Sequence, residues 1–311
     1  MDAELNVSYI TLDGYVEVHK YRFVYFVTMF AAYLLIICFN SSIVCLIFNH
    51  QNLHEPMYIF IAALLLNSVL YSTNIYPKLL IDFLSEKQII SYSACIFQYF
   101  ILYSLGSAEF LLLTAMSYDR YVSICKPLQY PTIMTKRNIC ILLVLAWVLA
   151  ACHVVVPTIL SAETKLCNFT FKGIVCNNAI YGLLCVQTSA LSVYGVVAVV
   201  DLIILPFLFI IFTYTKIFII TCLPHLMVLI SFSCLSIYDI AIVRVESSFP
   251  KTARLIMTLQ IVLYHPLFNP LIYGLKMKEI SKHLNRLFCP FLMYSHFFLI
   301  KSCLDYDMFH I

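Results

Sequence analysis

The chain has few charged residues. Asp, Glu, Lys and Arg make up 11% of its 311 residues, whereas 62% are hydrophobic. Soluble domains contain about 25% charged residues, so no soluble core of this size could cover so much apolar surface. The net charge is only +3, and no run of Lys or Arg exceeds two residues, which excludes a nucleic-acid binder. The composition therefore predicts a single-domain membrane protein with several spans.

Several sequence signatures are also absent. No CxxC occurs among the 13 cysteines, so we expect no metal site of the zinc type. No HExxH or GxSxG string is present, which argues against an intramembrane metalloprotease or serine hydrolase, so we expect no enzyme and no cofactor. The chain has only 6 glycines and no evident internal repeat, and both features count against a transporter or channel.

Long apolar stretches are abundant. A membrane-spanning helix needs about 20 apolar residues, and seven stretches meet this requirement: 23–48, 57–83, 94–124, 139–160, 189–220, 221–243 and 253–275. Basic and apolar residues then alternate over 276–288, which predicts a short amphipathic helix on the membrane surface. The expected fold is an all-α membrane protein, a seven-helix transmembrane bundle over 23–288. Residues 1–22 would form an extracellular segment and residues 289–311 a cytoplasmic tail.

The orientation rests on glycosylation acceptors. With the N-terminus outside, ten Lys and Arg residues fall inside and nine outside, a margin that decides nothing. Asn6 and Asn168 each begin an Asn-x-Ser/Thr sequon, and both would lie outside in this topology. These two sites favour an extracellular N-terminus and a multi-pass protein of the plasma membrane.

Five strings carry more specific information. The central one is Met116-Ser117-Tyr118-Asp119-Arg120-Tyr121-Val122-Ser123-Ile124-Cys125-Lys126-Pro127, which ends the third apolar stretch. An Asp-Arg pair where a hydrocarbon-length helix meets water is costly unless it serves a purpose. The other four strings read LHEPMY at 53–58, YPKLL at 76–80, TCLPH at 221–225 and PLFNPLIY at 266–273.

Taken in order and at their spacing, these strings resemble those of the odorant-receptor branch of the rhodopsin-like G-protein-coupled receptors. Their amino-acid sequences look most like those of the fish-type receptors. The resemblance covers most of the chain. It implies a receptor that binds a small-molecule odorant within the bundle and activates a heterotrimeric G protein of the cyclic-AMP pathway. It also implies contact with membrane lipid and a place in sensory-neuron cilia.

The resemblance assigns an activation switch to two places. Asp119, Arg120 and Tyr121 would form the switch at the end of span three, where the permanently charged Arg120 pairs with Asp119 at rest. Asn269, Pro270 and Tyr273 would form the partner switch in span seven. The alternatives are an ion pair that only sets topology and a passive proline kink.

A buried acid and two disulfides follow from the same resemblance. Glu109 lies about three helical turns before Arg120, and a carboxylate at that depth is costly. The family can hold a cation between this glutamate and an acid in span two, but here the matching stretch reads Asn67-Ser68. The alternative for Glu109 is a protonated carboxyl group that is hydrogen-bonded to neighbouring helices. Four cysteines allow three pairings, of which the resemblance selects Cys95–Cys176 and Cys167–Cys185, with free thiols as the alternative.

The odorant site would lie between spans three, five and six. Helical spacing places a set of side chains on the inward faces, with ordinary helix packing as the alternative for each: Leu102, Tyr103, Gly106, Ser107, Tyr194, Ala198, Asp201, Ser233, Ser236, Ile237 and Ile240. Asp201 interrupts a long apolar run. It would be either a counter-ion for a cationic odorant or a structural hydrogen-bonding group.

The chain departs from the family between spans five and six. Thr213 to Ile220 run directly into Thr221, where odorant receptors place a basic loop of about fifteen residues. An alternative function is therefore a membrane protein of the same fold that does not couple to a G protein, because this loop is missing.

Overall fold

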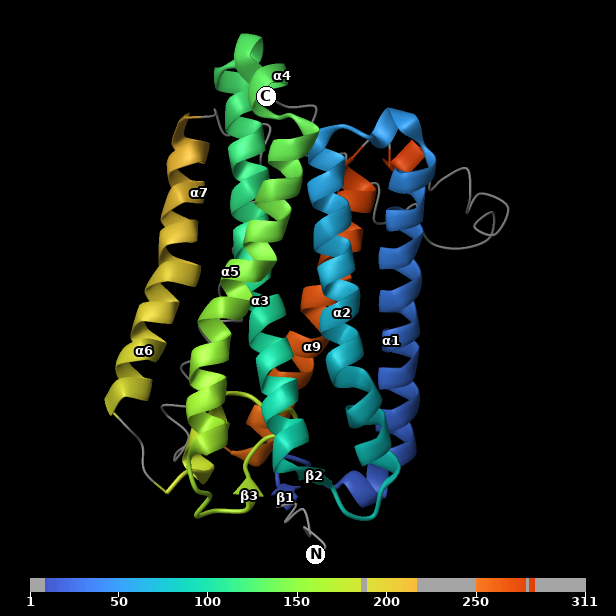
Figure 1. Ribbon diagram of the computed structural model, residues 1–311. Coiled ribbons are helices and arrows are strands. Elements are labelled where there is room, and N and C mark those ends of the chain that lie inside the picture. Colours follow the sequence, from blue (N-terminus) through green and yellow to red (C-terminus); the bar gives the residue numbers. More distant parts are fainter. Residues whose placement is uncertain (1–8, 186–188, 217–249, 278–279, 283–311) are drawn as a thin grey trace, which may run out of the picture.

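The structure of the protein is a computed structural model that describes residues 9–185, 189–216, 250–277 and 280–282. Long helices run side by side through it (Figure 1). Within the described ranges, six helical segments are long and apolar enough to cross a membrane. The predicted span over 221–243 lies outside the described residues, as do the junction before it and the tail over 289–311.

The helices begin and end close to the predicted limits. They are α1 (Val18–Asn49), α2 (Pro56–Leu84), α3 (Tyr92–Cys125), α5 (Lys136–Glu163) and α9 (Lys251–Lys276). Span five comprises α6 (Ser189–Val199), the π turn η4 (Val200–Ile204) and α7 (Leu205–Lys216). The multi-span helical prediction is confirmed. The first helix starts five residues earlier than expected, because Val18 is buried in a cluster with residues of α2, α3 and α9.

Local signals account for where several helices begin. The Ser91 hydroxyl accepts a hydrogen bond from the Ala94 amide at the start of α3, and Thr135 caps α5 through the Asn138 amide, both at 3.3 Å. Pro56 occupies the first turn of α2, where its missing N–H costs nothing. These side chains satisfy amide donors that have no partner within the first turn of a helix.

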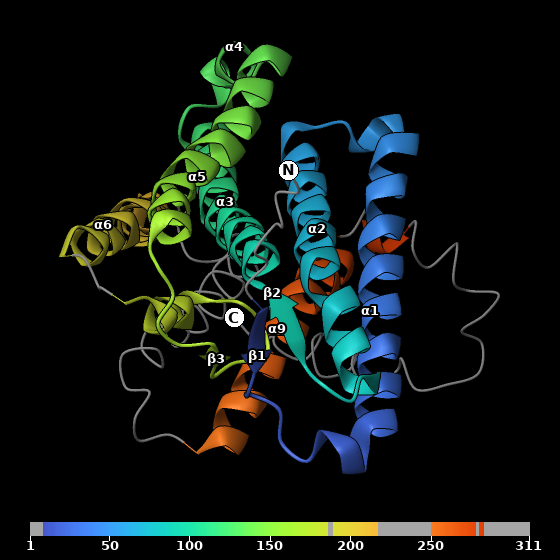
Figure 2. The same ribbon diagram turned by 60° about the horizontal axis from the view of Figure 1, so that its bottom comes forward.

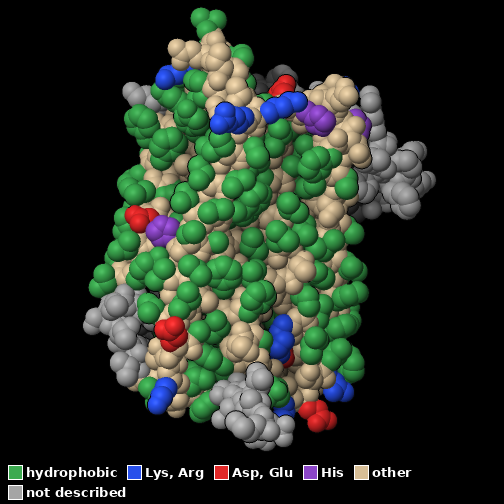
Figure 3. Space-filling model, viewed as in Figure 1, with side chains coloured by type: hydrophobic (Ala, Val, Ile, Leu, Met, Phe, Trp, Pro, Cys, Tyr) green, Lys and Arg blue, Asp and Glu red, His purple; other side chains and the backbone are tan. Residues whose placement is uncertain are grey.

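The helix α3 lies at the centre of the bundle and packs against α2, α5 and α7. Its inward face joins the largest buried cluster with residues of α1, α2 and α9. Hydrophobic side chains cover the flank of the molecule, while most Lys and Arg residues gather near its two ends (Figure 3). An apolar belt between two charged ends is the pattern that a lipid bilayer requires.

A small sheet closes the end of the bundle where the described chain begins (Figure 2). Strand β1 (Tyr9–Leu12) lies between β2 (Ile89–Ser91), with which it is antiparallel, and β3 (Thr170–Phe171), with which it is parallel. Ile10 and Leu12 of β1 are buried beneath it. The sequence-based expectation of an entirely α-helical chain missed this sheet, because strands of four, three and two residues carry no periodic signal.

Short helical turns complete the described chain. They are η1 (Gln51–Leu53), η2 (Pro127–Gln129), α4 (Tyr130–Ile133) and η3 (Asn178–Leu183). Of the surface helix expected over 276–288, the structure describes only residues 276, 277 and 280–282, among which Ile280 is buried in the core. Most of that expected helix is therefore outside the described residues.

Candidate functional site

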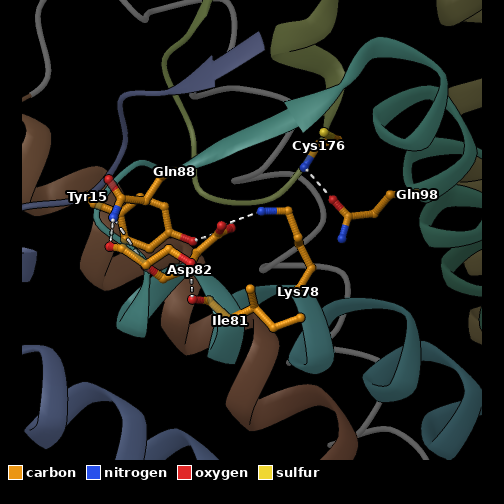
Figure 4. A network of polar contacts seen from close by, with 8 residues as sticks. Tyr15, Lys78, Ile81, Asp82, Gln88, Gln98 and Cys176 are labelled. Atoms are coloured by element: carbon orange, nitrogen blue, oxygen red, sulfur yellow. Dashed lines mark hydrogen bonds and ion pairs between the residues drawn. The ribbon is translucent and has the colours of Figure 1, made fainter. Parts of the chain in front are cut away.

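Two disulfides hold the long loop between α5 and α6. Cys95 in the first turn of α3 is bonded to Cys176, and Cys167 is bonded to Cys185. These are the pairings that the resemblance implies. The Cys176 amide also donates to the Gln98 side-chain oxygen at 3.1 Å (Figure 4). The loop is thus fixed to the first turns of α3, directly over the interior of the bundle.

A second polar cluster links the chain before α1 to α2. The Tyr15 hydroxyl donates to Asp82 at 3.1 Å, and Lys78 forms an ion pair with the same carboxylate (Figure 4). Burial, together with the Asp82 charge, raises the pKa of Tyr15 well above its ordinary value. Asp13 forms a further ion pair with Lys251 of α9 at 2.6 Å. The segment that carries β1 is therefore tied to both α2 and α9.

Tyrosines lie beneath the loop on α3. Tyr99 contacts Tyr181 of η3 through their hydroxyls, and the Tyr103 hydroxyl accepts from the Asn178 amide at 3.1 Å. Burial raises the pKa of Tyr181, so its phenol stays neutral. One turn deeper, a Cβ built on Gly106 would meet no atom of the described residues within 4 Å. These residues therefore leave open space next to Gly106, beneath the tyrosines and the loop.

The remaining residues expected at the odorant site fall into three groups. Leu102 is buried, and Tyr103, Ser107 and Ala198 are half-buried. Ser233, Ser236, Ile237 and Ile240 lie outside the described residues. Tyr194 and Asp201 differ from the expectation.

Tyr194 points toward α5 and donates to the His153 carbonyl at 3.0 Å. Asp201 is exposed, although helical spacing placed it on the same inward face as Tyr194 and Ala198. Asp201 lies in the π turn η4, where the extra residue of the turn rotates the side chains that follow relative to those before it. A regular 3.6-residue period therefore fails to predict which way Asp201 faces.

Glu109 is fully buried and hydrogen-bonded on both carboxylate oxygens. It accepts from the side-chain amides of Asn269 at 2.8 Å and Asn67 at 3.3 Å. Trp147 donates in turn to the Asn67 side-chain oxygen at 3.1 Å, and Asn269 also donates to Ser68 at 2.9 Å. Four helices, α2, α3, α5 and α9, thus meet at one buried carboxyl group.

The resemblance places Asn67 opposite Glu109, as the residue that stands where the family has an acid, but sequence reasoning missed Trp147 as a member of this site. The available signal was rarity, since Trp147 is the single tryptophan. Sequence reasoning also missed Asn40, a polar residue in an apolar run. It is fully buried in α1 and donates to the Pro266 carbonyl at 3.0 Å. Among the described residues, no group of three or more His, Cys, Asp or Glu residues lies close enough to hold a metal ion.

The switch residues of span three lie at the opposite end of the bundle. Asp119 is fully buried and forms an ion pair with Arg120 at 3.2 Å. The Tyr130 hydroxyl of α4 donates to the other Asp119 oxygen at 2.9 Å, while Tyr121 is half-buried. Burial, reinforced by the Asp119 charge, raises the pKa of Tyr130 above its ordinary value. Asp119 is therefore held from two sides.

The switch residues of span seven face the core. Asn269 and Tyr273 are fully buried, and the Tyr273 hydroxyl lies 3.9 Å from the Met116 sulfur of α3. Pro270 lies between them in α9. A contact thus connects α9 to the helix turn that precedes Asp119 and Arg120.

These features define a multi-pass helical membrane receptor, with a loop-covered interior at one end and a buried Asp-Arg pair at the other. A family model described as "Olfactory receptor" matches residues 29–290. The chain is 31% identical to olfactory receptor 11A1 of Homo sapiens over 301 residues, covering 91% of this chain and 94% of that protein. It is 30% identical to olfactory receptor 4M1 of Mus musculus over 302 residues, covering 91% and 95%. The chain belongs to the olfactory receptor family.

Proposed function

We propose that this protein is an odorant receptor, which binds a small-molecule odorant within the helix bundle and activates a heterotrimeric G protein. The observation that carries this function is membership of the olfactory receptor family over nearly the whole chain. The family is one of receptors rather than enzymes. The comparisons do not support the alternative of a non-coupling protein, whose basis lies at residues outside the described ranges.

The odorant site would lie next to Gly106, beneath the loop that the Cys95–Cys176 bridge holds in place. The space that the described residues leave open at Gly106 and the tyrosines above it support this location. Leu102 and Ala198 supply apolar surface, whereas Tyr103 and Ser107 supply hydroxyl groups. Such a pocket suits a small, mostly apolar molecule with one hydrogen-bonding group.

The switch would work through two contacts, the ion pair of Arg120 with Asp119 and the hydrogen bond of Asn269 to Glu109. At rest Arg120 pairs with Asp119, and Asn269 bonds to Glu109. On activation Arg120 would leave Asp119 and face the G protein, and Asn269 and Tyr273 would exchange partners around Pro270. A proline within a helix permits this, because it interrupts the backbone hydrogen bonds.

The proposed orientation places β1 and the disulfides outside the cell and α4 inside, in the plasma membrane and in contact with its lipid. Asn168 is exposed, as a glycosylation acceptor must be, and its side chain accepts from the Thr170 amide at 3.0 Å. The second acceptor, Asn6, lies outside the described residues. Expression in sensory-neuron cilia would follow from the family.

The test is a cyclic-AMP assay of the surface-expressed receptor against a panel of odorants. We expect at least one odorant to raise cyclic AMP in a concentration-dependent manner. A Gly106→Leu variant should lose the response while keeping its surface level, because the new side chain fills the space beside Tyr103. No response to any odorant by a receptor that reaches the surface would contradict the proposal.

A further inference from the structure

Prolines in the helices leave backbone carbonyls without their usual partner. Proline lacks an N–H, so the carbonyl four residues before it receives no intrahelical hydrogen bond. Pro266 and Pro270 of α9 free the carbonyls of Val262 and Pro266. The Tyr76 hydroxyl of α2 donates to the first at 3.4 Å, and Asn40 of α1 donates to the second at 3.0 Å.

The same arrangement occurs at a third site. Pro157 lies within α5 and frees the carbonyl of His153, to which Tyr194 of α6 donates at 3.0 Å. Three proline-freed carbonyls are therefore each bound by a side chain from another helix. A freed carbonyl buried without a partner costs about as much free energy as a lost hydrogen bond. Each of these contacts avoids that cost.

Tyr76 is the member of this set that fixes the outer half of α9. It is fully buried, and its ring stacks on Tyr33 of α1 with centroids 5.1 Å apart. It therefore belongs to the packed pair of α1 and α2, against which α9 lies (Figure 1). Val262 precedes Asn269 by about two helical turns, so the contact lies on the odorant side of the switch.

We propose that Tyr76 is a positioning residue for span seven. Its hydroxyl donates a hydrogen bond to the Val262 carbonyl, which Pro266 leaves without an intrahelical donor. This bond holds the outer half of α9 on α1 and α2 in the resting arrangement, in which Arg120 pairs with Asp119. Loss of this hydroxyl shifts the receptor toward its signalling arrangement without an odorant. The inference rests on the proposed function, since it assigns a role within the switch.

The test combines Tyr76→Phe with Pro266→Ala. Alanine at 266 restores the backbone N–H donor that the Val262 carbonyl lacks, so this carbonyl keeps a hydrogen bond when the Tyr76 hydroxyl is removed. Tyr76→Phe alone should raise odorant-free cyclic AMP per surface receptor by about twofold to fivefold, the range that one modest hydrogen bond accounts for. In the Pro266→Ala background the same change should have no effect. Tyr33→Phe is the matched control, because it removes a hydroxyl whose one partner among the described residues is the exposed Thr73 side chain.

Two further measurements make the outcome decisive. Thermal unfolding in detergent should be measured for the parent receptor, the two single variants and the double variant. We expect Tyr76→Phe to lower the unfolding temperature only when Pro266 is present. If Tyr76→Phe fails to reach the surface, adding Pro266→Ala should restore it. An equal effect of Tyr76→Phe in both backgrounds would overturn the inference. Arg120→Ala shows whether odorant-free signalling is measurable, because it should lower that signal. If it does, an unchanged odorant-free signal in Tyr76→Phe would also overturn the inference. Silence of the parent receptor with and without odorant would overturn the proposed function, and this inference with it.

Discussion

The side-chain amide of Asn269 in α9 donates to the Glu109 carboxylate of α3 at 2.8 Å, within a fully buried site. This bond connects the proline-containing segment of α9 to the centre of the bundle. Asn67 donates to the other carboxylate oxygen, so Glu109 accepts from α2 and α9 together.

We therefore expect Glu109→Ala to destabilise the receptor. It removes one acceptor from each of two buried amides, whose remaining acceptors are Ser68 for Asn269 and the Leu105 carbonyl for Asn67. Each lost hydrogen bond costs about 1 kcal/mol. The measurement is thermal unfolding of the purified receptor in detergent. The control is Ser104→Ala on the same helix, because the buried Ser104 hydroxyl has no hydrogen-bond partner among the residues that the structure describes. Equal unfolding temperatures for the two variants would show that the Glu109 contacts contribute little.

The two disulfides should contribute unequally. Cys95–Cys176 joins residues 81 apart in sequence, whereas Cys167–Cys185 joins residues 18 apart. Loss of a native bridge costs about 2–5 kcal/mol, and loop entropy makes the longer link worth about 1 kcal/mol more. Surface expression, followed by an antibody to an N-terminal tag, should fall further in Cys95→Ser than in Cys167→Ser. The reverse order would argue that Cys167–Cys185 is the principal restraint on the loop.

Tyr130 should hold the resting switch. Tyr130→Phe removes the hydroxyl that donates to Asp119 and leaves the Arg120 ion pair as its remaining support. We expect basal cyclic AMP per surface receptor to rise by about tenfold, since one hydrogen bond to a charged group is worth about 1.5 kcal/mol or more. Thr132→Ala, which removes only a local bond to the Gln129 carbonyl, should leave it unchanged. A fall in basal signalling in Tyr130→Phe would contradict this role.

The Tyr15 contact should depend on pH only under alkaline conditions. The raised pKa of Tyr15 means that the folded receptor keeps this proton better than the unfolded chain. Its contribution is therefore fully present below the unfolded pKa of about 10 and declines as the pH rises above that value. The difference in unfolding temperature between wild type and Tyr15→Phe should be constant from about pH 6 to 9 and shrink beyond pH 10. A difference that changes near neutral pH would point to another titrating group.

The spans were predictable because each is a long apolar run, and membrane helices must satisfy their backbone hydrogen bonds internally. The small sheet was not, since the pairing of Tyr9–Leu12 with Ile89–Ser91 and Thr170–Phe171 joins segments distant in sequence. Helical spacing failed at Asp201, where a π turn alters the period. The hydrogen bond from Trp147 to Asn67, a partner of Glu109, also escaped sequence reasoning, because the two residues lie 80 positions apart on different helices.

The central claim is that this chain is an odorant-activated receptor whose signal passes through Arg120. The most direct measurement compares odorant-evoked cyclic AMP for wild type and Arg120→Ala at matched surface levels, together with binding of the same odorant. The account predicts that wild type responds, and that Arg120→Ala binds the odorant with little change but does not signal. An undiminished response in Arg120→Ala, or no response from a surface-expressed wild type to any odorant, would contradict it.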